Sequence, residues 1–245
     1  MKFAAIADIH GNLRALEAVL ADISAAGITE IVNLGDHVSG PLEARRTADL
    51  LIDRGILCIR GDQDRRLLEL DRTGSCERAD YRQLGRKHLD WLAGLPTTTI
   101  YRDEVFLCHG SPRADAVYWL DRPTDDDADI RRSPVSAIES EAAGIAASLI
   151  LCGHTHIPRI VRLRDGRAVV NAGSVGCPGY TGDKPVRHKV ETGTPDACYA
   201  ILERTGQRWS ATLRYVPYDH AAMAEMARRN GSPAWASALA TGWVG

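Results

Sequence analysis

Residues 2–12 read KFAAIADIHGN, and this stretch sets a pattern that later parts of the chain repeat. Residues 2–7 form a short apolar run, which predicts a buried β-strand. Asp8 and His10 follow at once, and residues 12–25 then carry apolar side chains at helical spacing until Gly27 ends the predicted helix. Open α/β sheets bind ligands at the carboxyl ends of their strands, so this turn is a candidate binding position.

The first two-thirds of the chain alternate predicted strands and helices. Strands at 31–34 and 56–59 enclose a predicted helix at 41–54, and this βαβαβ order favours a parallel sheet with right-handed crossovers. Asp165-Gly166 is a strong hairpin signal between two later strands. The other predicted segments are helices at 64–70 and 80–93, a hairpin at 100–108, a loop or mobile excursion at 120–135, strands at 148–152, 159–163 and 168–171, a long loop at about 176–196, a hairpin of strands 198–202 and 209–216, and helices at 219–229 and 235–239.

Length and composition narrow the class of protein. The chain of 245 residues is long enough to bury a large core, and residues 1–245 are predicted to form a single domain. The formal net charge of −2 argues against stable nucleic-acid binding. No apolar run has the length that a bilayer needs, so we expect no membrane partner, and the interrupted apolar start is unlike a signal peptide. No feature of the sequence indicates an oligomeric state.

The cysteines point to a reducing compartment. There are six of them, and none forms a Cys-x-x-Cys pair of the kind that binds zinc. Cys58, Cys108 and Cys152 lie in or beside apolar runs, so we expect them to be small buried hydrophobic residues. Reduced thiols are typical of the cytoplasm, which is the predicted location.

Acidic residues and histidines follow the predicted strands at five places and would therefore converge on one edge of the fold. A lone Asp-x-His pair is equally a turn beside a surface histidine, but five such blocks at five strand ends favour a metal site. Carboxylates and imidazoles suit Zn, Mn or Fe, and two adjacent divalent ions can activate water and clamp a phosphoryl group. The candidate metal ligands are three carboxylates and four imidazoles, enough for two ions that share a ligand: Asp8, Asp36, Asp62, His10, His109, His154 and His156.

On these and neighbouring residues, the chain resembles the calcineurin-like metallophosphoesterase superfamily, particularly its small bacterial and archaeal phosphodiesterase branch. The resemblance implies an α/β fold, a four-layer αββα sandwich with two mixed β-sheets and the metal site at the carboxyl-terminal edges of the strands. It also implies two divalent metal ions, with Mn favoured among Mn, Fe, Zn, Mg and Ni. The matching blocks, in family order, are residues 7–12, 34–36, 60–64, 108–110, 152–156 and 171–176.

Roles for single residues follow from the resemblance by position. One metal would take Asp8, His10, Asp36 and His156, and the second would take Asp36, Asp62, His109 and His154, with Asp36 bridging. A hydroxide that bridges the metals would attack the phosphorus atom. Ser174 lies in the glycine-rich stretch that closes the site. Arg60 and Arg65 could pair with phosphate oxygens, or could equally be solvated. Asp64 could orient a metal-binding imidazole or cap a helix.

Two positions depart from the family pattern. Asp62 stands where the family has asparagine, and we hypothesise that its extra negative charge tightens the second metal and shifts preference towards monoanionic diesters. Gln63 replaces a histidine that in many members protonates the leaving group, and glutamine cannot act as an acid. His37 and His188 are the candidate substitutes, and each could otherwise be a solvated surface histidine.

The predicted function is therefore hydrolysis of a phosphodiester in a small molecule or nucleotide, with Asp36, Asp62, Gln63, His37 and His109 as the catalytic residues. Three alternatives remain open at this stage. The chain could be a phosphomonoesterase or phosphoprotein phosphatase, it could be a nucleotide pyrophosphatase, or it could be a non-catalytic metal-binding scaffold. The identity of the physiological substrate depends on loops whose structure does not follow from the sequence pattern.

Overall fold

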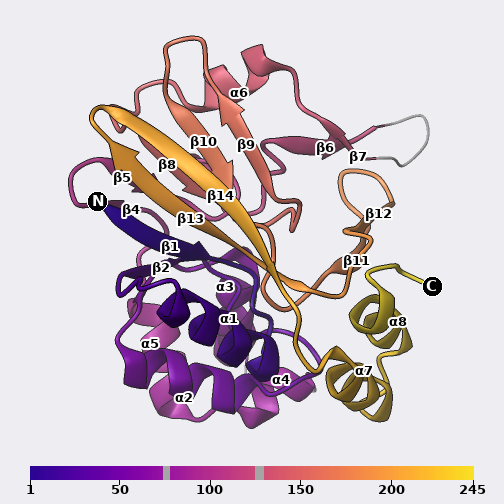
Figure 1. Cartoon of the computed structure of the whole chain (residues 1–245). Helices are drawn as coiled ribbons and strands as arrows, with labels where there is room; N and C mark the ends of the chain where they lie inside the picture. The colour runs from indigo at the N-terminus through magenta and orange to yellow at the C-terminus, as the bar shows by residue number, and fades with distance from the viewer. Residues whose placement is uncertain (74–77, 125–129) are drawn as a thin grey trace.

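Figure 1 shows the computed structural model of the chain, which describes residues 1–73, 78–124 and 130–245. In chain order the elements are β1 (Lys2–Ile6), α1 (Leu13–Ala25), β2 (Ile31–Asn33), α2 (Ala44–Arg54), β3 (Leu57–Cys58), α3 (Asp62–Thr73), α4 (Ala79–Gln83), α5 (Arg86–Gly94), β4 (Thr99–Tyr101), β5 (Val105–Leu107), β6 (Asp121–Pro123), β7 (Ile130–Arg132), α6 (Val135–Glu141), β8 (Leu149–Cys152), β9 (Arg159–Arg162), β10 (Ala168–Asn171), β11 (Gly179–Gly182), β12 (His188–Glu191), β13 (Ala197–Thr205), β14 (Arg208–Val216), α7 (His220–Arg229) and α8 (Pro233–Thr241).

Two mixed five-stranded sheets form the centre of the fold. The first has the order β14-β13-β1-β2-β3, and the second has the order β4-β5-β8-β10-β9. In each sheet three neighbouring strands are parallel, namely β1, β2 and β3 in the first and β5, β8 and β10 in the second. Helices α1, α2, α3 and α5 lie on one side of the pair of sheets and α6 on the other (Figure 1). The predicted αββα sandwich is confirmed.

Alternating side chains along the strands build this layering. In β1, Phe3 and Ala5 belong to the core between the two sheets, together with Leu107 and Leu151 of the second sheet. The intervening Ala4 and Ile6 pack against the apolar face of α1. Because successive side chains of a strand point to opposite faces, an apolar run without polar interruptions is buried on both sides.

The helical layers follow from local signals in the sequence. Asn12 caps α1, its side chain accepting a hydrogen bond from the Ala15 backbone N–H at 3.2 Å. Gly55 ends α2 in the left-handed conformation, with φ of 60°. On the second sheet, Ile138 of α6 is buried with Ile150 and Val169, and closes the fourth layer.

Most predicted elements are present, and the differences concern short segments. The predicted helix at 80–93 is two helices, because Leu84 and Gly85 are extended between α4 and α5. The helix predicted from residue 41 begins at Ala44, and α6 was not predicted. Cys58, Cys108 and Cys152 are buried as expected, while Cys76 lies outside the described residues.

Two segments predicted to be loops contain β-hairpins instead. Within 120–135, β6 and β7 pair antiparallel, and residues 125–129 of that prediction lie outside the described residues. Within 176–196, β11 and β12 pair antiparallel, and along β12 the buried His188 is followed by the exposed Lys189. Each of these four strands has only three or four residues, which is too short for a period-two pattern to stand out from a stretch rich in charge, glycine and proline.

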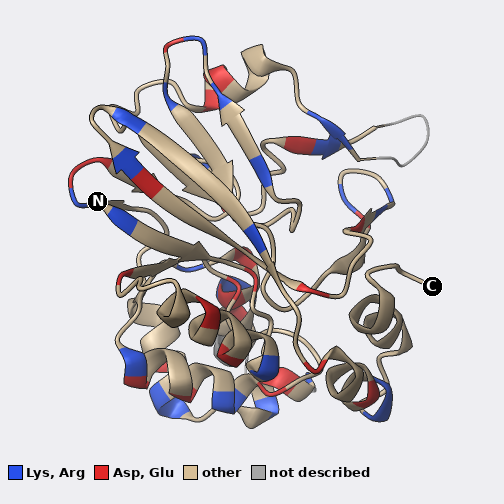
Figure 2. Ribbon diagram, in the orientation of Figure 1, with Lys and Arg blue, Asp and Glu red and all other residues tan. Residues whose placement is uncertain are grey.

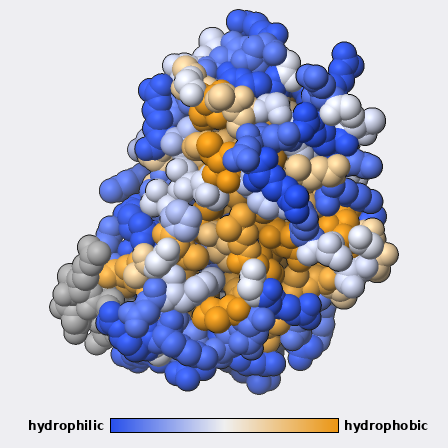
Figure 3. Space-filling view, turned by 90° about the vertical axis from the view of Figure 1, so that its left-hand side faces the viewer, coloured by the Kyte–Doolittle hydropathy of each residue, from blue (hydrophilic) through white to orange (hydrophobic). Residues whose placement is uncertain are grey.

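The surface is mixed in charge and in polarity. Lys and Arg alternate with Asp and Glu over the helices below the first sheet in the view of Figure 2. Figure 3 shows a face on which apolar residues gather in a band between hydrophilic ones. Separately, a hollow of about 380 Å³ is lined by Leu20, Ile56 and Leu57. No helix in the described part of the chain is long and apolar enough to cross a membrane.

Candidate metal centre

The seven predicted metal ligands all lie just beyond strand ends, and they converge. Asp8 and His10 follow β1, Asp36 follows β2, and Asp62 is the first residue of α3 after β3. In the second sheet, His109 follows β5, while His154 and His156 follow β8. Since the parallel strands of both sheets end on the same side, segments separated by up to about 150 residues in the chain meet at one place, as the Asp8–His156 pair shows.

The backbone at these turns is strained. Among the described residues, seven other than glycine have positive φ, and five of these are candidate ligands: Asp8, His10, Asp36, His154 and His156, with φ between 51° and 67°. Side chains rarely adopt this left-handed region, at a cost of about 1 kcal/mol or more each. Such strain persists only where the surrounding structure enforces it, and it gathers at functional sites.

Two glycines let the turns approach one another closely. A Cβ atom at Gly61 would overlap Oδ1 of Asp36, and one at Gly153 would lie 2.6 Å from Oδ2 of Asp8. The Gly153 turn is also fixed by its backbone, since the N–H of His154 donates to Asp8 Oδ2 at 3.0 Å. Both glycines are therefore required by the packing of the ligand-bearing turns.

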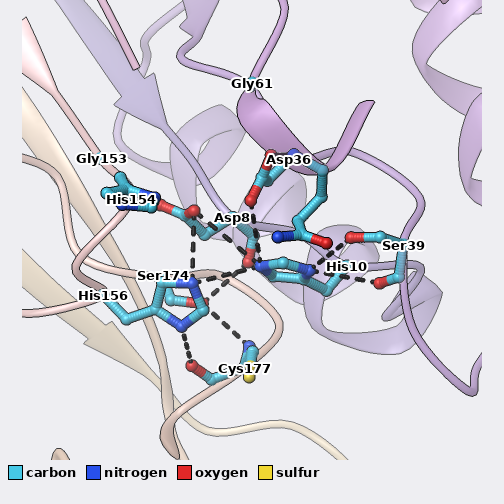
Figure 4. Close-up of polar contacts among 12 residues, drawn as sticks. Asp8, His10, Asp36, Ser39, Gly61, Gly153, His154, His156, Ser174 and Cys177 are labelled. Atoms are coloured by element: carbon cyan, nitrogen blue, oxygen red, sulfur yellow. Dashed lines mark hydrogen bonds and ion pairs between the residues drawn. The ribbon is translucent and has the colours of Figure 1, made fainter. Parts of the chain in front are cut away.

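One group of ligand atoms centres on Asp8. Its Oδ1 lies 3.3 Å from His156 Nε2 and 3.9 Å from His10 Nε2. The two imidazole nitrogens are themselves only 3.2 Å apart. Figure 4 shows the rings of His10 and His156 turned towards the Asp8 carboxylate. These three side chains are close enough to hold one metal ion together.

A second group centres on Asp62. Its Oδ1 lies 3.1 Å from His154 Nδ1 and 3.3 Å from His109 Nε2. Asp36 lies between the groups, with its Oδ2 3.4 Å from His109 Nε2 and 3.7 Å from His10 Nε2. Asp8, Asp36 and His109 also form a set of ligand atoms within reach of one ion. The two groups are thus adjacent and joined by a carboxylate.

Unpartnered polar atoms show that the cluster fits metal ions. Asp8 Oδ1, Asp62 Oδ1 and His109 Nε2 are buried and have no hydrogen-bond partner among the described residues. Buried polar atoms are nearly always paired, by protein, water or an ion. The oxygen and imidazole donors are the types that Zn, Mn and Fe accept, so the residues fit the divalent ions that the fold implies.

The field inside the cluster favours positive charge. Burial would lower the pKa of His109 and His156, but the carboxylates of Asp36 and Asp8 raise both well above their usual range. Burial would likewise raise the pKa of Asp8, yet the neighbouring imidazoles, that of His156 foremost, lower it to about 2. Three buried carboxylates gathered in one place attract a cation, whether a proton or a metal ion.

The outer nitrogens of three imidazoles are held by neighbouring groups. His109 Nδ1 donates to the Leu34 carbonyl and His156 Nδ1 donates to the Cys177 carbonyl, both at 2.7 Å. His10 Nδ1 lies 2.8 Å from Ser39 Oγ, as Figure 4 shows. These contacts set each ring so that Nε2 points into the cluster as a ligand.

Removing the Ser39 hydroxyl tests this orientation. We expect Ser39→Ala to weaken binding of Mn²⁺ to metal-stripped protein by about tenfold, since loss of such an outer partner costs at least that much. We expect no larger loss of affinity because the Ser39 carbonyl, 3.2 Å from His10 Nδ1, remains as a hydrogen-bond acceptor. Titration calorimetry measures the affinity, and Ser210→Ala, at an exposed hydroxyl of β14, is the control. Equal affinity in wild type and Ser39→Ala would contradict the assigned orientation.

Asp64 and His37 form a buried pair beneath the cluster. The Asp64 carboxylate accepts hydrogen bonds from the backbone N–H groups of Asp36, His37 and Gly61 at 2.9–3.0 Å. His37 Nδ1 lies 2.7 Å from Asp64 Oδ2, and both side chains are fully buried. Asp64 thus fixes the turn that carries Asp36, and His37 is neither a surface residue nor part of the cavity wall.

A cavity of about 700 Å³ opens over the cluster. Gln63 lines it, with its Nε2 donating to Asp62 Oδ2 and its backbone N–H donating to Asp36 Oδ1, each at 2.9 Å. The cavity also has cationic and aromatic walls that the sequence did not single out as ligand contacts: Arg66, Arg78, Lys184, Tyr180 and Trp235. They come from helices, from loops and from the β11–β12 hairpin, so no local motif marks them.

The three predicted substrate-binding residues lie elsewhere. Arg60 donates to the Ala93 carbonyl at 3.4 Å, and Arg65 is paired with Asp115 at 2.7 Å. The Ser174 hydroxyl donates to the Asp8 carbonyl and accepts from the Cys177 N–H, both at 2.8 Å. None of the three lines the cavity. Ser174 instead supports the strained turn at Asp8.

His188, the other candidate acid, supports an aromatic wall. Its Nδ1 donates to the Val186 carbonyl at 2.7 Å, which leaves Nε2 to accept from the Tyr118 hydroxyl at 2.8 Å. Tyr118 lines the cavity, as does Tyr180, whose hydroxyl lies 2.6 Å away. Burial raises the pKa of Tyr118 to about 12, so this phenol stays neutral near pH 7.

Comparison with known proteins agrees with this geometry. The family model of the calcineurin-like phosphoesterase superfamily domain matches residues 1–193. An uncharacterised protein of Methanocaldococcus jannaschii is 26% identical over 262 aligned positions, covering 95% of this chain and 94% of that protein. The crystal structure of a metallophosphoesterase from Sphaerobacter thermophilus has a TM-score of 0.75 and 26% identity, covering 99% of this chain and 100% of that one.

A further structure shows the same fold at lower identity. A hypothetical protein from Pyrococcus horikoshii aligns with a TM-score of 0.73 and 19% identity over 100% of this chain and 99% of that one. The family match spans every turn that contributes to the cluster, from Asp8 to His156. The chain belongs to the calcineurin-like phosphoesterase superfamily.

Proposed function

We propose that the protein is a metal-dependent phosphodiesterase. The observation that carries the proposal is the pair of adjacent ligand groups, around Asp8 and around Asp62, joined through Asp36. We assign Asp8, His10, Asp36 and His156 to one ion and Asp36, Asp62, His109 and His154 to the other. Held by these residues, two divalent ions would supply an activated water molecule and would neutralise charge on the phosphoryl oxygens.

The shape of the cavity supports a diester rather than a small monoester. Its volume of about 700 Å³ is within the range of sites for drug-sized ligands. Tyr118 borders it beside His154 and Tyr180 borders it beside His156, with ring centroids 5.0 and 4.7 Å apart. Trp235 of α8 borders it beside His10, with 5.8 Å between the ring centroids. Aromatic rings thus border the cavity near both ligand groups, where the two substituents of a diester would contact them.

Gln63 orients the Asp62 carboxylate and does not act as an acid. The amide is engaged with the Asp62 carboxylate and has no proton to release near neutral pH. We infer that turnover is fastest with esters whose leaving group departs as an anion. The alternative functions, monoester hydrolysis and pyrophosphate hydrolysis, use the same ligand groups and differ in what the cavity walls accept.

Two chromogenic esters test the proposal. Metal-stripped protein with Mn²⁺ added back should hydrolyse bis-p-nitrophenyl phosphate faster than p-nitrophenyl phosphate, and neither ester should be hydrolysed without metal. Both release p-nitrophenolate, which leaves without prior protonation, so Gln63 is not limiting. A faster monoester reaction would favour the phosphatase alternative. If two Mn²⁺ bind and neither ester reacts, the phosphodiesterase proposal is wrong and the scaffold alternative is favoured.

A further inference from the structure

Asp62 makes different contacts with each of its two oxygens. Oδ1 faces the cluster of candidate ligands, 3.1 Å from His154 Nδ1 and 3.3 Å from His109 Nε2. Oδ2 faces outward, where it accepts from Gln63 Nε2 at 2.9 Å and lies 3.3 Å from the Arg66 guanidinium. The carboxylate therefore connects the metal cluster to a cation, which an amide in the same place would not attract.

Arg66 is placed to act on a bound phosphate. It follows Asp62 by four residues on α3, so the two side chains lie on the same face of the helix. Its side chain is 50% exposed and lines the cavity. The neighbouring Arg65 is instead paired with Asp115 and with Glu69 at 2.7 and 2.8 Å and does not line the cavity. Of these two arginines, Arg66 is the one that faces the cavity.

We propose that Arg66 is a positioning residue that acts with Asp62 as a unit, restoring the positive charge that Asp62 removes and holding a phosphoryl oxygen over the metal centre. The inference deepens the phosphoesterase function proposed above and rests on it. A guanidinium carries five N–H donors in a rigid fork. With one end directed to Asp62 Oδ2, its remaining donors are available to an anion in the cavity.

The pairing alters the charge balance that the sequence predicts for the site. Compared with asparagine, Asp62 adds one negative charge and would by itself make the site less positive. Arg66 lies within ion-pair distance of Asp62 and returns one positive charge to the same region. The net charge therefore does not by itself favour diesters over monoesters, and the choice between them falls to the cavity walls.

Binding of inorganic phosphate to Mn²⁺-loaded protein tests the proposal without turnover. We expect Arg66→Gln to weaken phosphate binding by about tenfold, because a hydrogen bond to a charged group is lost. Binding of Mn²⁺ to the metal-stripped variant should be unchanged or tighter, since a cation near the ligands has been removed. Titration calorimetry measures both affinities, and a variant with a merely damaged site would lose both.

A matched control and a second background complete the experiment. Arg14→Gln removes an arginine of α1 that is 51% exposed and 3.5 Å from the exposed Asp219, and it should change neither affinity. In an Asp62→Asn background at saturating Mn²⁺, adding Arg66→Gln should weaken phosphate binding by no more than about threefold, because the unit is already broken.

Three results would overturn the inference. These are a wild-type protein that binds no phosphate at millimolar concentration, an Arg66→Gln variant within about twofold of wild type, and an equal loss in both backgrounds, which would show no coupling. The ester assay distinguishes failure of the inferred Arg66 role from failure of the proposed phosphodiesterase function. Ester hydrolysis with an indifferent Arg66 contradicts only the inference, whereas coupled phosphate binding without hydrolysis contradicts only the phosphodiesterase.

Discussion

Replacing Asp36 with alanine is expected to lower kcat for metal-dependent ester hydrolysis by on the order of 10³-fold, because its carboxylate lies within reach of both ligand groups and would be lost to both. Asp36 is 2% exposed, and its Oδ2 lies within 3.7 Å of His10 Nε2 and 3.4 Å of His109 Nε2. Its loss removes a ligand from both ions at once. We therefore also expect fewer than two Mn²⁺ per chain, measured by metal analysis after dialysis.

Asp36→Asn distinguishes the lost charge from a collapsed turn. The Asn side chain can keep the hydrogen bond that Asp36 Oδ1 accepts from the Gln63 N–H, so the local fold should survive while the charge is lost. Asp90→Ala, at an acid of α5 that is 58% exposed, is the surface control. Retention of two Mn²⁺ and of more than about a tenth of the wild-type rate in Asp36→Ala would refute the bridging assignment.

The cluster of candidate ligands could be predicted from sequence because each candidate lies next to a local signal. Asp8, Asp36 and His109 each lie two or three residues after the end of a buried strand, and parallel strands bring their carboxyl ends together. Gly61 and Gly153 are also local signals, because each lies where the ligand-bearing turns pack too closely for a side chain at that position. What the sequence does not display is the strained left-handed backbone at the ligands, which arises from the packing of distant segments.

The cavity walls could not be predicted, because they depend on contacts between distant parts of the chain. Arg65 and Arg66 are adjacent and look alike in the sequence, but Asp115, 50 residues away, pairs with the first and leaves the second at the cavity. Ser174 was expected to contact the substrate, yet its hydroxyl donates a hydrogen bond to the backbone carbonyl of Asp8. The hairpin that carries Tyr180 has too few residues for its alternation to be read.

Asp64, the last residue of the block Gly61-Asp62-Gln63-Asp64, holds the turn that carries Asp36. Of the substitutions considered, replacement of Asp64 should lower the stability of the fold most. Asp64 accepts three backbone N–H groups and the His37 imidazolium while fully buried. Burial would lower the pKa of His37, but the Asp64 charge raises it to about 10. Burial would raise the pKa of Asp64, and the His37 charge lowers it instead. Both groups are therefore charged at neutral pH.

We expect Asp64→Asn to lower the free energy of unfolding by about 3–5 kcal/mol at pH 6, the usual cost of removing one partner of a buried ion pair. The asparagine amide would also turn N–H donors towards the N–H groups of Asp36 or Gly61. Urea unfolding followed by circular dichroism measures the difference. Asp49→Asn breaks an Asp–His pair in which Asp49 is 35% exposed, 3.0 Å from His88, and should cost no more than about 1 kcal/mol.

The difference in unfolding free energy between wild type and Asp64→Asn should change with pH, which a general loss of packing would not cause. The folded pKa of His37, about 10, lies above its unfolded value of about 6.5, so its stabilisation is complete below pH ~6.5 and is lost as the pH rises through 10. Asp64 has a lowered pKa, so its stabilisation is present above pH ~4 and is lost as the pH falls. The gap between wild type and Asp64→Asn should therefore be widest between pH ~4 and ~6.5 and should narrow towards pH 10. A gap that stays constant over this range would mean that the buried pair is not charged in the folded protein.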